Sequence, residues 1–407
     1  MRRLKIVHLI DLAKVGGVES MFADFIQATP PSGLEVEHYT IVDSPELAPR
    51  FRDSVAKHSR LLASPKTLGP FKLPRRPYWM RAQRRLALIR RCRPDLVIAW
   101  NQFTDFRVAA LKLGCPLIYY EHGMSWYDHS PRQLAGFLPY VTGAIAVSQA
   151  ARRMLELKHH LQVPIDVCLN PLPTRLLPPA ATTGRTLPTN RPLRLGMAAR
   201  LVPLKAVGLL ILAVKKLREQ GVQVEAWIAG EGPERPVLER LIRQHDLADS
   251  VRLLGLVDDM PAFYQDIDLF VMTSMHESLS LVCLEAMAWG LPVIAQCVDG
   301  IVEVVPNGQA GMLLPATLTI AEYAALTGAS TAFARQVYDP LSDQLVETHL
   351  LSPETLALAV NSYLQQPLLY QTHSQRAAVV GSQWPSYFDF IQRLYAILRR
   401  YLISSAV

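Results

Sequence analysis

The sequence predicts an α/β protein built from two doubly wound domains. Short apolar runs, such as residues 5–10 (KIVHLI), 95–100 (DLVIAW) and 268–274 (DLFVMTS), alternate with segments of helical apolar spacing. These runs are apolar throughout, which is typical of parallel strands covered on both faces. Because 407 residues are too many for one ordinary core, we expect the alternation to form two domains.

The first half begins with the strand at 5–10 and a helix over 16–28. Further strands are expected at 36–42, 95–100, 116–120 and 144–148, and a basic helix passes through Leu86 and Ile89. Residues 170–192 are rich in Pro and Thr and lack periodicity, so 176–191 is interpreted as a linker.

A second alternation follows the linker. Strands are expected at 193–200, 224–230, 251–255, 268–274, 292–295 and 311–315, and helices at 206–219, 233–245, 260–264 and from about 281. Residues 316–350 fit this order poorly and are treated as a partly helical insertion. In doubly wound domains, the ligand is expected between the carboxyl ends of the strands.

The amino-acid composition is that of a folded protein. Half of the residues are apolar and 19% are charged, as in folded proteins. The N-terminal apolar run is too short for a signal peptide and no run reaches the length of a membrane span, so we expect a cytoplasmic location. The five cysteines are scattered without metal-ligand spacing, which indicates reduced thiols rather than disulfides or a zinc site.

Positive charge is concentrated in the basic region, residues 66–93. It contains ten Lys or Arg residues and no acidic residue, with Phe71, Tyr78 and Trp79 interleaved. One interpretation is a solvated helix face after a loop. The other is a patch for anionic lipid head groups or an anionic acceptor. Nothing resembles a nucleic-acid recognition motif, so no nucleic-acid partner is expected.

Two glutamates bracket the start of the helix after 268–274, in the segment 276–285 (HESLSLVCLE). The first turn of a helix presents backbone N–H groups and a positive dipole, which favour an anion such as phosphate. Glu277 lies just before this turn and Glu285 one turn inside it. Carboxylates accept hydrogen bonds from hydroxyl groups, so sugars on either side of a phosphate are suitable partners. A dipole-complementing glutamate and a solvent-facing one are the alternative.

Two cations, Arg200 and Lys205, follow the strand at 193–200 in the same half. Each could be a surface charge. At the carboxyl end of a strand they could instead hold a diphosphate and stabilise it as a leaving group.

The chain resembles the family 4 glycosyltransferases, which are retaining enzymes of the GT-B type fold. The segments that carry the resemblance are GMAARLVPLK, AGEGPER, VRLLGLVDD, the EX7E signature ESLSLVCLEAMAWGLPVIA, DGIVEVVPNGQAGMLL and, in the first half, GGVES, YYEHG, AVSQAARRML and LNPLP. It implies two Rossmann-like domains facing a central cleft. Residues 384–402 resemble a final helix that crosses back, giving a first domain of 1–175 plus about 384–407 and a second of 192–383 with the insertion at about 316–350.

The resemblance also implies roles for individual residues. Arg200 and Lys205 would bind the donor diphosphate, Glu285 the nucleotide ribose and Glu277 the transferred sugar. His122 would project toward the reacting sugar, although a buried structural histidine is the alternative. The remaining donor-binding positions would be Gly16, Gly17, Gly230, Gly232, Val257, Ser278, Leu279, Ser280, Leu281 and Val282.

The sequence departs from the family pattern at two places, and it contains a DxD motif that is typical of another glycosyltransferase fold. The family often has Lys-Gly where this chain has Lys205-Ala206, and two glycines before the later glutamate where it has 299–303 (DGIVE). Asp266 and Asp268 form a DxD, a metal-binding pattern of the other large glycosyltransferase fold, but here they match a structural position. No metal and no cofactor are expected, and the nucleotide sugar is a substrate.

The resulting hypothesis is a retaining glycosyltransferase that moves a sugar from a nucleotide-sugar donor to a glycan or lipid-linked glycan. The expected pathway is bacterial surface polysaccharide synthesis, such as lipopolysaccharide, capsule or exopolysaccharide. The basic region would place the enzyme peripherally at the inner face of the cytoplasmic membrane. A nucleotide-sugar epimerase of the same fold and a catalytically inactive nucleotide-binding scaffold are the alternatives.

Overall fold

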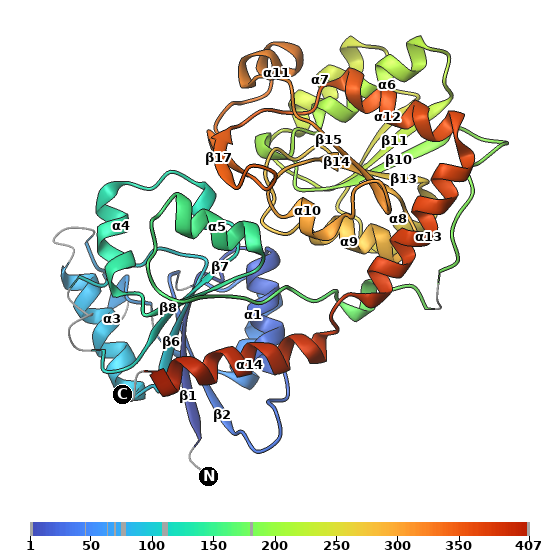
Figure 1. The fold of residues 1–407 in the computed structure, drawn as a ribbon. Coiled ribbons are helices and arrows are strands. Elements are labelled where there is room, and N and C mark those ends of the chain that lie inside the picture. Colours follow the sequence, from blue (N-terminus) through green and yellow to red (C-terminus); the bar gives the residue numbers. More distant parts are fainter. Residues whose placement is uncertain are drawn as a thin grey trace. The chain divides into compact units, whose positions relative to one another are not determined.

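The computed structural model describes residues 3–44, 46–62, 64–68, 71–74, 79–107, 113–179 and 182–404 (Figure 1). The chain divides into two compact units. The first unit comprises Met1–Leu169 and Phe388–Val407, and the second comprises Asn170–Tyr387.

The first unit contains a seven-stranded parallel sheet in its described part. In sheet order its strands are β3 (Arg60–Leu62), β2 (Val36–Val42), β1 (Leu4–Ile10), β6 (Leu96–Trp100), β7 (Leu117–Glu121), β8 (Gly143–Ala146) and β9 (Ile165–Val167). Its helices are α1 (Gly17–Gln27), α2 (Pro49–His58), α3 (Trp79–Cys92), α4 (Pro131–Phe137), α5 (Gln149–Leu157) and α14 (Tyr387–Ser404), and a short hairpin joins β4 (Thr67–Leu68) to β5 (Phe71–Lys72). The chain order reverses beside β1, which is the Rossmann arrangement.

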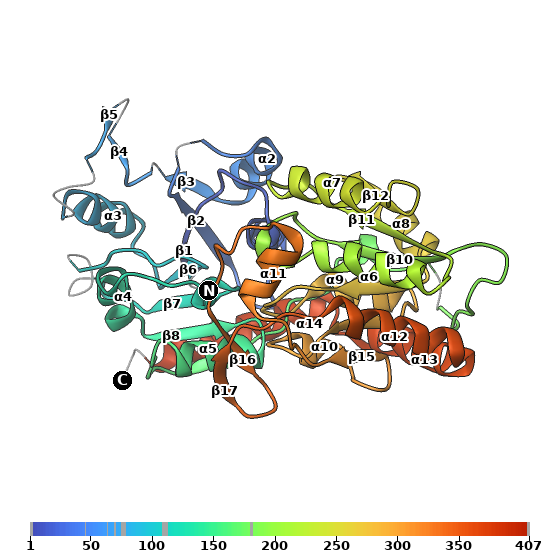
Figure 2. The same ribbon diagram turned by 90° about the horizontal axis from the view of Figure 1, so that it is seen from above.

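The second unit repeats this plan with a six-stranded parallel sheet. In sheet order its strands are β12 (Val251–Gly255), β11 (Val224–Ala229), β10 (Leu193–Ala198), β13 (Leu269–Met272), β14 (Val293–Gln296) and β15 (Gly311–Leu314). Its helices are α6 (Gly208–Glu219), α7 (Arg235–Gln244), α8 (Met260–Asp266), α9 (Leu281–Ala288), α10 (Ile301–Val304), α11 (Ile320–Thr327), α12 (Pro353–Gln365) and α13 (Pro367–Gln383), with α6, α12 and α13 visible beside the sheet in Figure 2. The predicted fold class, two Rossmann-like parallel sheets with flanking helices, is confirmed.

The last helix, α14, belongs to the first unit and packs on its sheet. The Tyr401 hydroxyl donates to the carbonyl oxygens of Ala144 and Pro164, each at 3.0 Å. A side chain at Gly143 would meet the Tyr401 ring, because an added Cβ would lie 2.0 Å from it. Tyr395 also contacts Phe25 of α1, with ring centroids 5.4 Å apart, so α14 covers this face of the sheet.

Residues 316–350 form a helix and a hairpin. Helix α11 begins with a capping box, in which Thr319 and Glu322 exchange side-chain and backbone hydrogen bonds, and it ends at Gly328. The segment Gln336–Asp339, in the insertion that was expected to be partly helical, is the strand β16, which pairs antiparallel with β17 (Gln344–Glu347). The reason is local: Asp339 accepts from the Leu341 and Ser342 amides, which closes a turn between the two strands.

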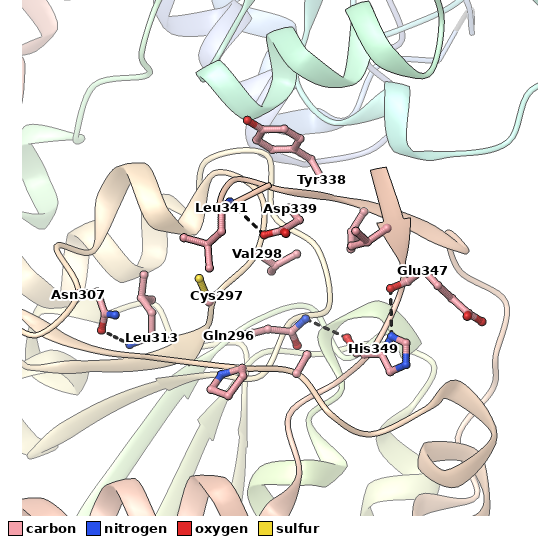
Figure 3. Close-up of a pocket in the computed structure, with 14 residues that line it drawn as sticks. Gln296, Cys297, Val298, Asn307, Leu313, Tyr338, Asp339, Leu341, Glu347 and His349 are labelled. Atoms are coloured by element: carbon pink, nitrogen blue, oxygen red, sulfur yellow. Dashed lines mark hydrogen bonds between the residues drawn. The ribbon is translucent and has the colours of Figure 1, made fainter. Parts of the chain in front are cut away.

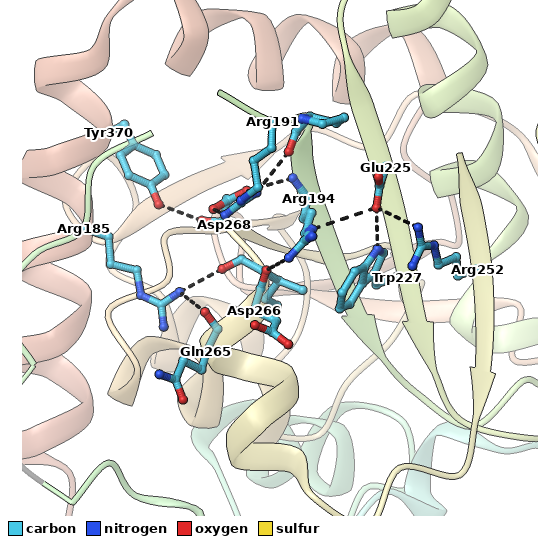
Figure 4. Close-up of polar contacts among 12 residues, drawn as sticks. Arg185, Arg191, Arg194, Glu225, Trp227, Arg252, Gln265, Asp266, Asp268 and Tyr370 are labelled. Carbon is cyan, nitrogen blue, oxygen red and sulfur yellow. Dashed lines mark hydrogen bonds and ion pairs between the residues drawn. The ribbon is translucent and has the colours of Figure 1, made fainter. Parts of the chain in front are cut away.

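Asp268, the second aspartate of the DxD, anchors the segment that precedes β10 to the second sheet (Figure 4). Both carboxylate oxygens of Asp268 accept from Arg191 at 2.7 Å, and one also accepts from the Arg194 amide at 2.8 Å. Arg185, within the predicted linker, donates to the carbonyl oxygens of Tyr264 and Ile267 at the end of α8. Asp268 therefore fixes the chain that enters β10, as expected for a structural position.

The basic region is partly described. Arg75, Arg76 and Tyr78 lie outside the described residues, whereas Phe71, Lys72 and Trp79 are exposed. Arg85 is not part of a solvated face: it is buried on α3, donates to the Asp105 carbonyl at 3.0 Å and lies 3.7 Å from the Asp43 carboxylate. Among the helices that the structure describes, none is long and apolar enough to cross a membrane.

Candidate active site

An ion pair joins two of the predicted site residues at the carboxyl edge of the second sheet. Lys205 follows β10 and Glu277 follows β13, and these strands are neighbours. Their side chains meet with Lys205 Nζ 2.5 Å from Glu277 Oε1. Both are mostly shielded from solvent, with side chains 20% and 12% exposed. The pair thus lies where the strand order reverses, which is where doubly wound sheets bind ligands.

The backbone around Lys205 is held against the segment that follows β13. The Thr273 hydroxyl donates to the Lys205 carbonyl at 2.8 Å, and the Met275 amide donates to the Leu204 carbonyl at 3.0 Å. Ala206 adopts φ 47°, a left-handed conformation that glycine accepts at lower cost. This left-handed conformation explains why the family often has a glycine at the position of Ala206.

Asp299 fixes the backbone of Glu277, and sequence reasoning did not assign it a role. Its carboxylate is fully buried and accepts from the amides of Glu277 at 3.2 Å and Tyr338 at 2.8 Å. The next residue, Gly300, donates to the Glu277 carbonyl at 3.0 Å, and a Cβ there would lie 2.2 Å from the Ser278 carbonyl oxygen. The Asp-Gly pair therefore clamps the loop that carries Glu277, and the DGIVE segment was its only sequence signal.

Two predicted glycines support the loop that carries Arg200. Gly230 has φ 137°, and a Cβ on it would lie 1.9 Å from the Ala199 carbonyl oxygen. A Cβ on Gly232 would lie 2.3 Å from the Leu201 carbonyl oxygen. Arg200, between these contacts, is exposed at the end of β10. The glycines are required because two backbone segments approach closely, which any side chain would prevent.

The loop that carries Val257, a predicted donor-binding position, is joined to Gly230. The Gly230 amide donates to the Gly255 carbonyl at 2.7 Å, and Gly255 itself has φ 75°. Val257, two residues further on, is partly exposed. The loops after β10, β11 and β12 are thereby linked to one another through their backbones.

Helix α9 begins at Leu281, as the pattern around 276–285 predicts. Ser280 precedes it with φ 64°, and its hydroxyl donates to the Cys283 sulfur rather than capping a backbone amide. Ser278, Leu281 and Val282 are partly exposed, whereas the Leu279 side chain is buried and can contribute only backbone to a ligand. The first turn of α9 follows the Glu277 loop directly.

Glu285 lies on α9 in a mostly apolar environment. Burial raises its pKa from 4.5 to about 7, although a hydrogen bond from Tyr264 and the charge of Arg175 act in the opposite direction. The Tyr264 hydroxyl donates to Glu285 Oε2 at 2.7 Å. The pKa of Tyr264 is raised well above its ordinary value, mainly by burial, so it remains a donor. Tyr264, on α8, was not predicted, because nothing in the sequence relates it to a glutamate on α9.

His122 lies at the carboxyl end of β7 in the first unit. Its amide donates to the Asn101 side-chain oxygen at 2.9 Å, which also accepts from the Met124 amide at 3.0 Å. The His122 ring stacks on Trp100, with centroids 5.9 Å apart, and burial lowers its pKa to about 3. The ring is thus a neutral group held by a rigid loop. Asn101 is a further positioning residue that sequence reasoning missed.

The other predicted residues of the first unit, Gly16 and Gly17, begin α1. Gly16 is the N-cap of this helix, and a Cβ there would lie 2.6 Å from the Glu19 carboxylate. Gly17 is exposed, with open space around its missing side chain. This loop follows β1, so it also lies at the carboxyl edge of its sheet.

Comparison with known proteins places the chain among glycosyltransferases. Residues 15–176 match the family model described as Glycosyltransferase Family 4, and residues 192–328 match that described as Glycosyl transferases group 1. The lipopolysaccharide core biosynthesis glycosyltransferase LpsE of Rhizobium meliloti is 25% identical over 376 residues, which cover 85% of this chain and 92% of LpsE. The putative colanic acid biosynthesis glycosyltransferase WcaL of Escherichia coli is 34% identical over 132 residues, 30% of this chain and 32% of WcaL.

Solved structures share the whole fold. Anabaena HepE in complex with UDP-glucose superposes with a TM-score of 0.68 at 19% identity, covering 98% of this chain and all of HepE. WaaG, a glycosyltransferase involved in lipopolysaccharide biosynthesis, superposes with a TM-score of 0.62 at 14% identity, covering 97% and 99% of the two chains. From the two family models and this shared GT-B type fold, the chain belongs to the family 4 glycosyltransferases.

Proposed function

We propose that this glycosyltransferase transfers a sugar, with retention of configuration and without a metal ion, from a nucleotide sugar to a glycan acceptor of a bacterial surface polysaccharide. The ion pair between Lys205 and Glu277 carries the proposal, because it places a cation and a carboxylate together at the ligand edge of the sheet. The names of LpsE and WcaL support the polysaccharide pathway. The HepE complex with UDP-glucose supports a uridine nucleotide donor.

The proposed roles follow from the chemistry of each group. Lys205 and the exposed Arg200 bind the diphosphate and stabilise the charge that develops as it leaves. Backbone amides at the start of α9 bind the same anion. Glu277 accepts hydrogen bonds from hydroxyl groups of the transferred sugar, and Glu285 accepts them from the ribose. The neutral ring of His122 contributes a hydrogen-bonding group on the acceptor side.

The proposed reaction keeps the acceptor and the leaving group on one face of the sugar. The bond between the sugar C1 and the phosphate oxygen breaks, and the acceptor oxygen bonds to C1. The acceptor proton passes to the departing phosphate oxygen. This path needs no carboxylate as a covalent nucleophile, and the positive charges lower its barrier by stabilising the phosphate.

The same fold also accommodates nucleotide-sugar epimerases, but the relatives found favour transfer. Acceptor dependence distinguishes the two reactions. A transferase releases nucleoside diphosphate faster when acceptor is added, whereas an epimerase converts donor without any acceptor.

The first test is Glu277→Gln, which keeps the shape of the side chain and removes its charge. Loss of a group that binds more strongly in the transition state should lower kcat by about 100-fold or more. Release of UDP from UDP-glucose and a panel of other nucleotide sugars, with lipopolysaccharide core oligosaccharides as acceptors, measures this effect.

The matched control is Glu219→Gln, which changes a glutamate on the surface of α6 that pairs only with Lys215 among the described residues. It should leave both kcat and KM unchanged. Full activity of Glu277→Gln on the best donor would disprove the assignment of this site. A product that NMR shows to be a mixture of anomers, or to have the inverted configuration at C1, would disprove retention.

We also propose that the basic region brings the first unit to an anionic membrane surface. Phe71 and Trp79 are 75% and 51% exposed, and Lys72, Arg90 and Arg91 are exposed in the same region. Exposed aromatic and basic side chains together suit the interface of a bilayer that contains anionic lipids.

Replacing both Arg90 and Arg91 by Gln should weaken binding to phosphatidylglycerol-containing vesicles by about 10- to 30-fold, since each basic residue contributes roughly 1 kcal/mol near the surface. The control replaces the exposed Arg240 and Arg243 of α7 by Gln, with the same change of net charge. Vesicle flotation measures both variants. Equal binding to vesicles of phosphatidylcholine alone would contradict an electrostatic role.

A further inference from the structure

A cavity of about 480 Å³ lies between the carboxyl ends of β14 and β15 and the hairpin β16–β17 (Figure 3). We call it the hairpin pocket. Gln296 and Cys297 line it from the end of β14, Leu313 from β15, and Val346 from the hairpin. Its volume lies within the roughly 300–1,000 Å³ that is usual for small-molecule sites. The family resemblance assigns it no role, because the hairpin belongs to the insertion.

The lining of the hairpin pocket excludes phosphate-containing ligands. Its fourteen described residues include two carboxylates, Asp339 and Glu347, and no lysine or arginine. An anionic ligand would be repelled by these carboxylates without a compensating cation. The walls between them are largely aliphatic, as at Val298, Leu341 and Val346. Carboxylates with aliphatic walls suit a ligand that has hydroxyl donors and C–H faces.

A buried acceptor points to a ligand independently of the carboxylates. Gln296 is 1% exposed, and its amide nitrogen donates to the His349 carbonyl at 2.9 Å. Its amide oxygen has no hydrogen-bond partner among the described residues. Figure 3 shows this side chain among the lining residues, between Cys297 and His349. A buried carbonyl without a donor is costly, and a ligand hydroxyl would remove that cost.

The hairpin pocket is linked to the donor-site loop by Asp299. This carboxylate accepts from the Tyr338 amide on β16 and from the Glu277 amide, and the Asp299 amide donates to the Tyr338 carbonyl at 3.0 Å. Tyr338 lines the pocket. The same buried side chain therefore holds one wall of the pocket and the loop that carries Glu277.

We propose that the hairpin pocket binds an uncharged or amino-substituted saccharide unit of the acceptor glycan, held by Gln296 beside the donor-site loop. This inference rests on the proposed function, since it names a subsite of the same enzyme. A hydroxyl group of the saccharide donates to the Gln296 amide oxygen. The C–H faces of the sugar ring contact Val298 and Val346.

Saturation-transfer NMR on the intact chain tests the proposal directly. The probes are the methyl glycosides of glucose, galactose, glucosamine and N-acetylglucosamine, and a lipopolysaccharide core oligosaccharide, each with UDP present to occupy the donor site. We expect saturation transfer to the ring protons of at least one probe. Transfer to none of them overturns the proposal.

A matched pair of variants locates the binding. Val346→Trp fills the hairpin pocket, whereas Val379→Trp places the same side chain on α13, away from it, at a valine of the same 37% exposure. Saccharide signals should fall at least about ten-fold in Val346→Trp and remain in Val379→Trp. Equal signals in the two variants overturn the proposal.

Cysteine alkylation tests the same proposal on the unsubstituted protein, so it remains informative if Val346→Trp does not fold. Cys297 lines the pocket and is partly exposed, and Cys115, partly exposed in the first unit, is an internal control. A bound saccharide should slow alkylation of Cys297 by N-ethylmaleimide several-fold and leave Cys115 unchanged, as read by peptide mass spectrometry. Equal rates for Cys297 with and without saccharide contradict the assignment.

The proposed function and the proposed role of the hairpin pocket can be disproved independently of each other. Hydrolysis of the donor without acceptor reports on the donor site alone, so its loss counts against the proposed function. Normal donor hydrolysis combined with acceptor use that is equal in Val346→Trp and Val379→Trp counts against the hairpin pocket alone.

Discussion

At the scale of single residues, the two glutamates of the EX7E signature have different environments. Glu277 is paired with Lys205 at 2.5 Å, whereas Glu285 is buried with Tyr264 as its hydrogen-bond donor. Burial favours the protonated form of the Glu285 carboxyl group. The two glutamates, eight positions apart, are therefore suited to different partners, because Glu277 lies beside a cation and Glu285 lies in an apolar wall.

The pKa of Glu285 predicts how stability depends on pH. Because burial raises it from 4.5 to about 7, the folded state binds the proton more tightly than the unfolded state. Stability contributed by the protonated form is therefore present at pH 4.5 and lost as the pH rises to about 7, a loss of about 3 kcal/mol. Glu285→Gln should melt like the wild type at pH 5 and several degrees higher at pH 8.

Thermal unfolding of both proteins without nucleotide, followed by fluorescence between pH 5 and 8, measures this difference. Glu277→Gln serves as the comparison, because it removes the carboxylate that is paired with Lys205. A constant difference in melting temperature across this pH range would contradict the proposed protonation of Glu285.

At the scale of elements, the site is built from turns that follow parallel strands. The loops after β10, β11 and β12 contact each other through Gly230, Gly232 and Gly255, and the loop after β13 is clamped by the Asp299–Gly300 pair after β14. Backbone contacts of this kind leave no room for side chains. These backbone contacts fix the positions of Arg200, Lys205 and Glu277, although the glycines and Asp299 need not touch a ligand themselves.

Gly230→Ala should therefore disrupt the Arg200 loop. The new Cβ would lie 1.9 Å from the Ala199 carbonyl oxygen, and φ 137° is itself unfavourable for alanine. We expect UDP affinity to fall by about ten-fold or more and the melting temperature to decrease. Calorimetric titration with UDP and thermal unfolding measure the two effects.

Gly221→Ala provides the control. Gly221 also has a positive φ, 78°, but an added Cβ would have nothing within 4 Å. It should cost only about 1 kcal/mol of backbone strain and leave UDP affinity intact. Equal effects of the two substitutions on UDP binding would show that close backbone approach is not what Gly230 provides.

At the scale of the whole molecule, the chain leaves the first unit at residue 169 and returns to it at residue 388. The returning helix α14 fills a position over β8 that Gly143 leaves open for Tyr401. The first unit is therefore complete only when the last residues of the chain have been added. Its stability depends on a helix that begins more than 200 positions after β9, the last strand of its sheet in the sequence.

Tyr401→Ala should destabilise the first unit selectively. It removes a buried ring and two hydrogen bonds to Ala144 and Pro164, at a cost of about 3 kcal/mol or more. If the second unit holds the proposed donor site, added UDP should raise the temperature of its transition in calorimetry, and Tyr401→Ala should leave that transition in place. Phe388→Ala, at a 69% exposed position of the same helix, should change neither transition. A shift confined to the UDP-sensitive transition would contradict this assignment.

The sequence by itself determined the fold class, the family and the parallel strands of both sheets except β3 and β9 at the edges of the first. Uniformly apolar runs between helical segments are a local signal of parallel strands, and the motif order from GMAARLVPLK to DGIVEVVPNGQAGMLL identified the glycosyltransferase. It also indicated that Lys205 and Glu277 act in one site, because both follow strands whose carboxyl ends share an edge.

Only the tertiary structure decided which groups contact each other. The pairing of Tyr264 with Glu285 and the contacts of Asp299 with Glu277 and with Tyr338 each join segments 20 or more residues apart, with no local periodicity to indicate them. A burial-raised pKa for Glu285 and a pocket under the hairpin are likewise properties of the packed chain, because desolvation and enclosure depend on neighbours that are distant in the sequence.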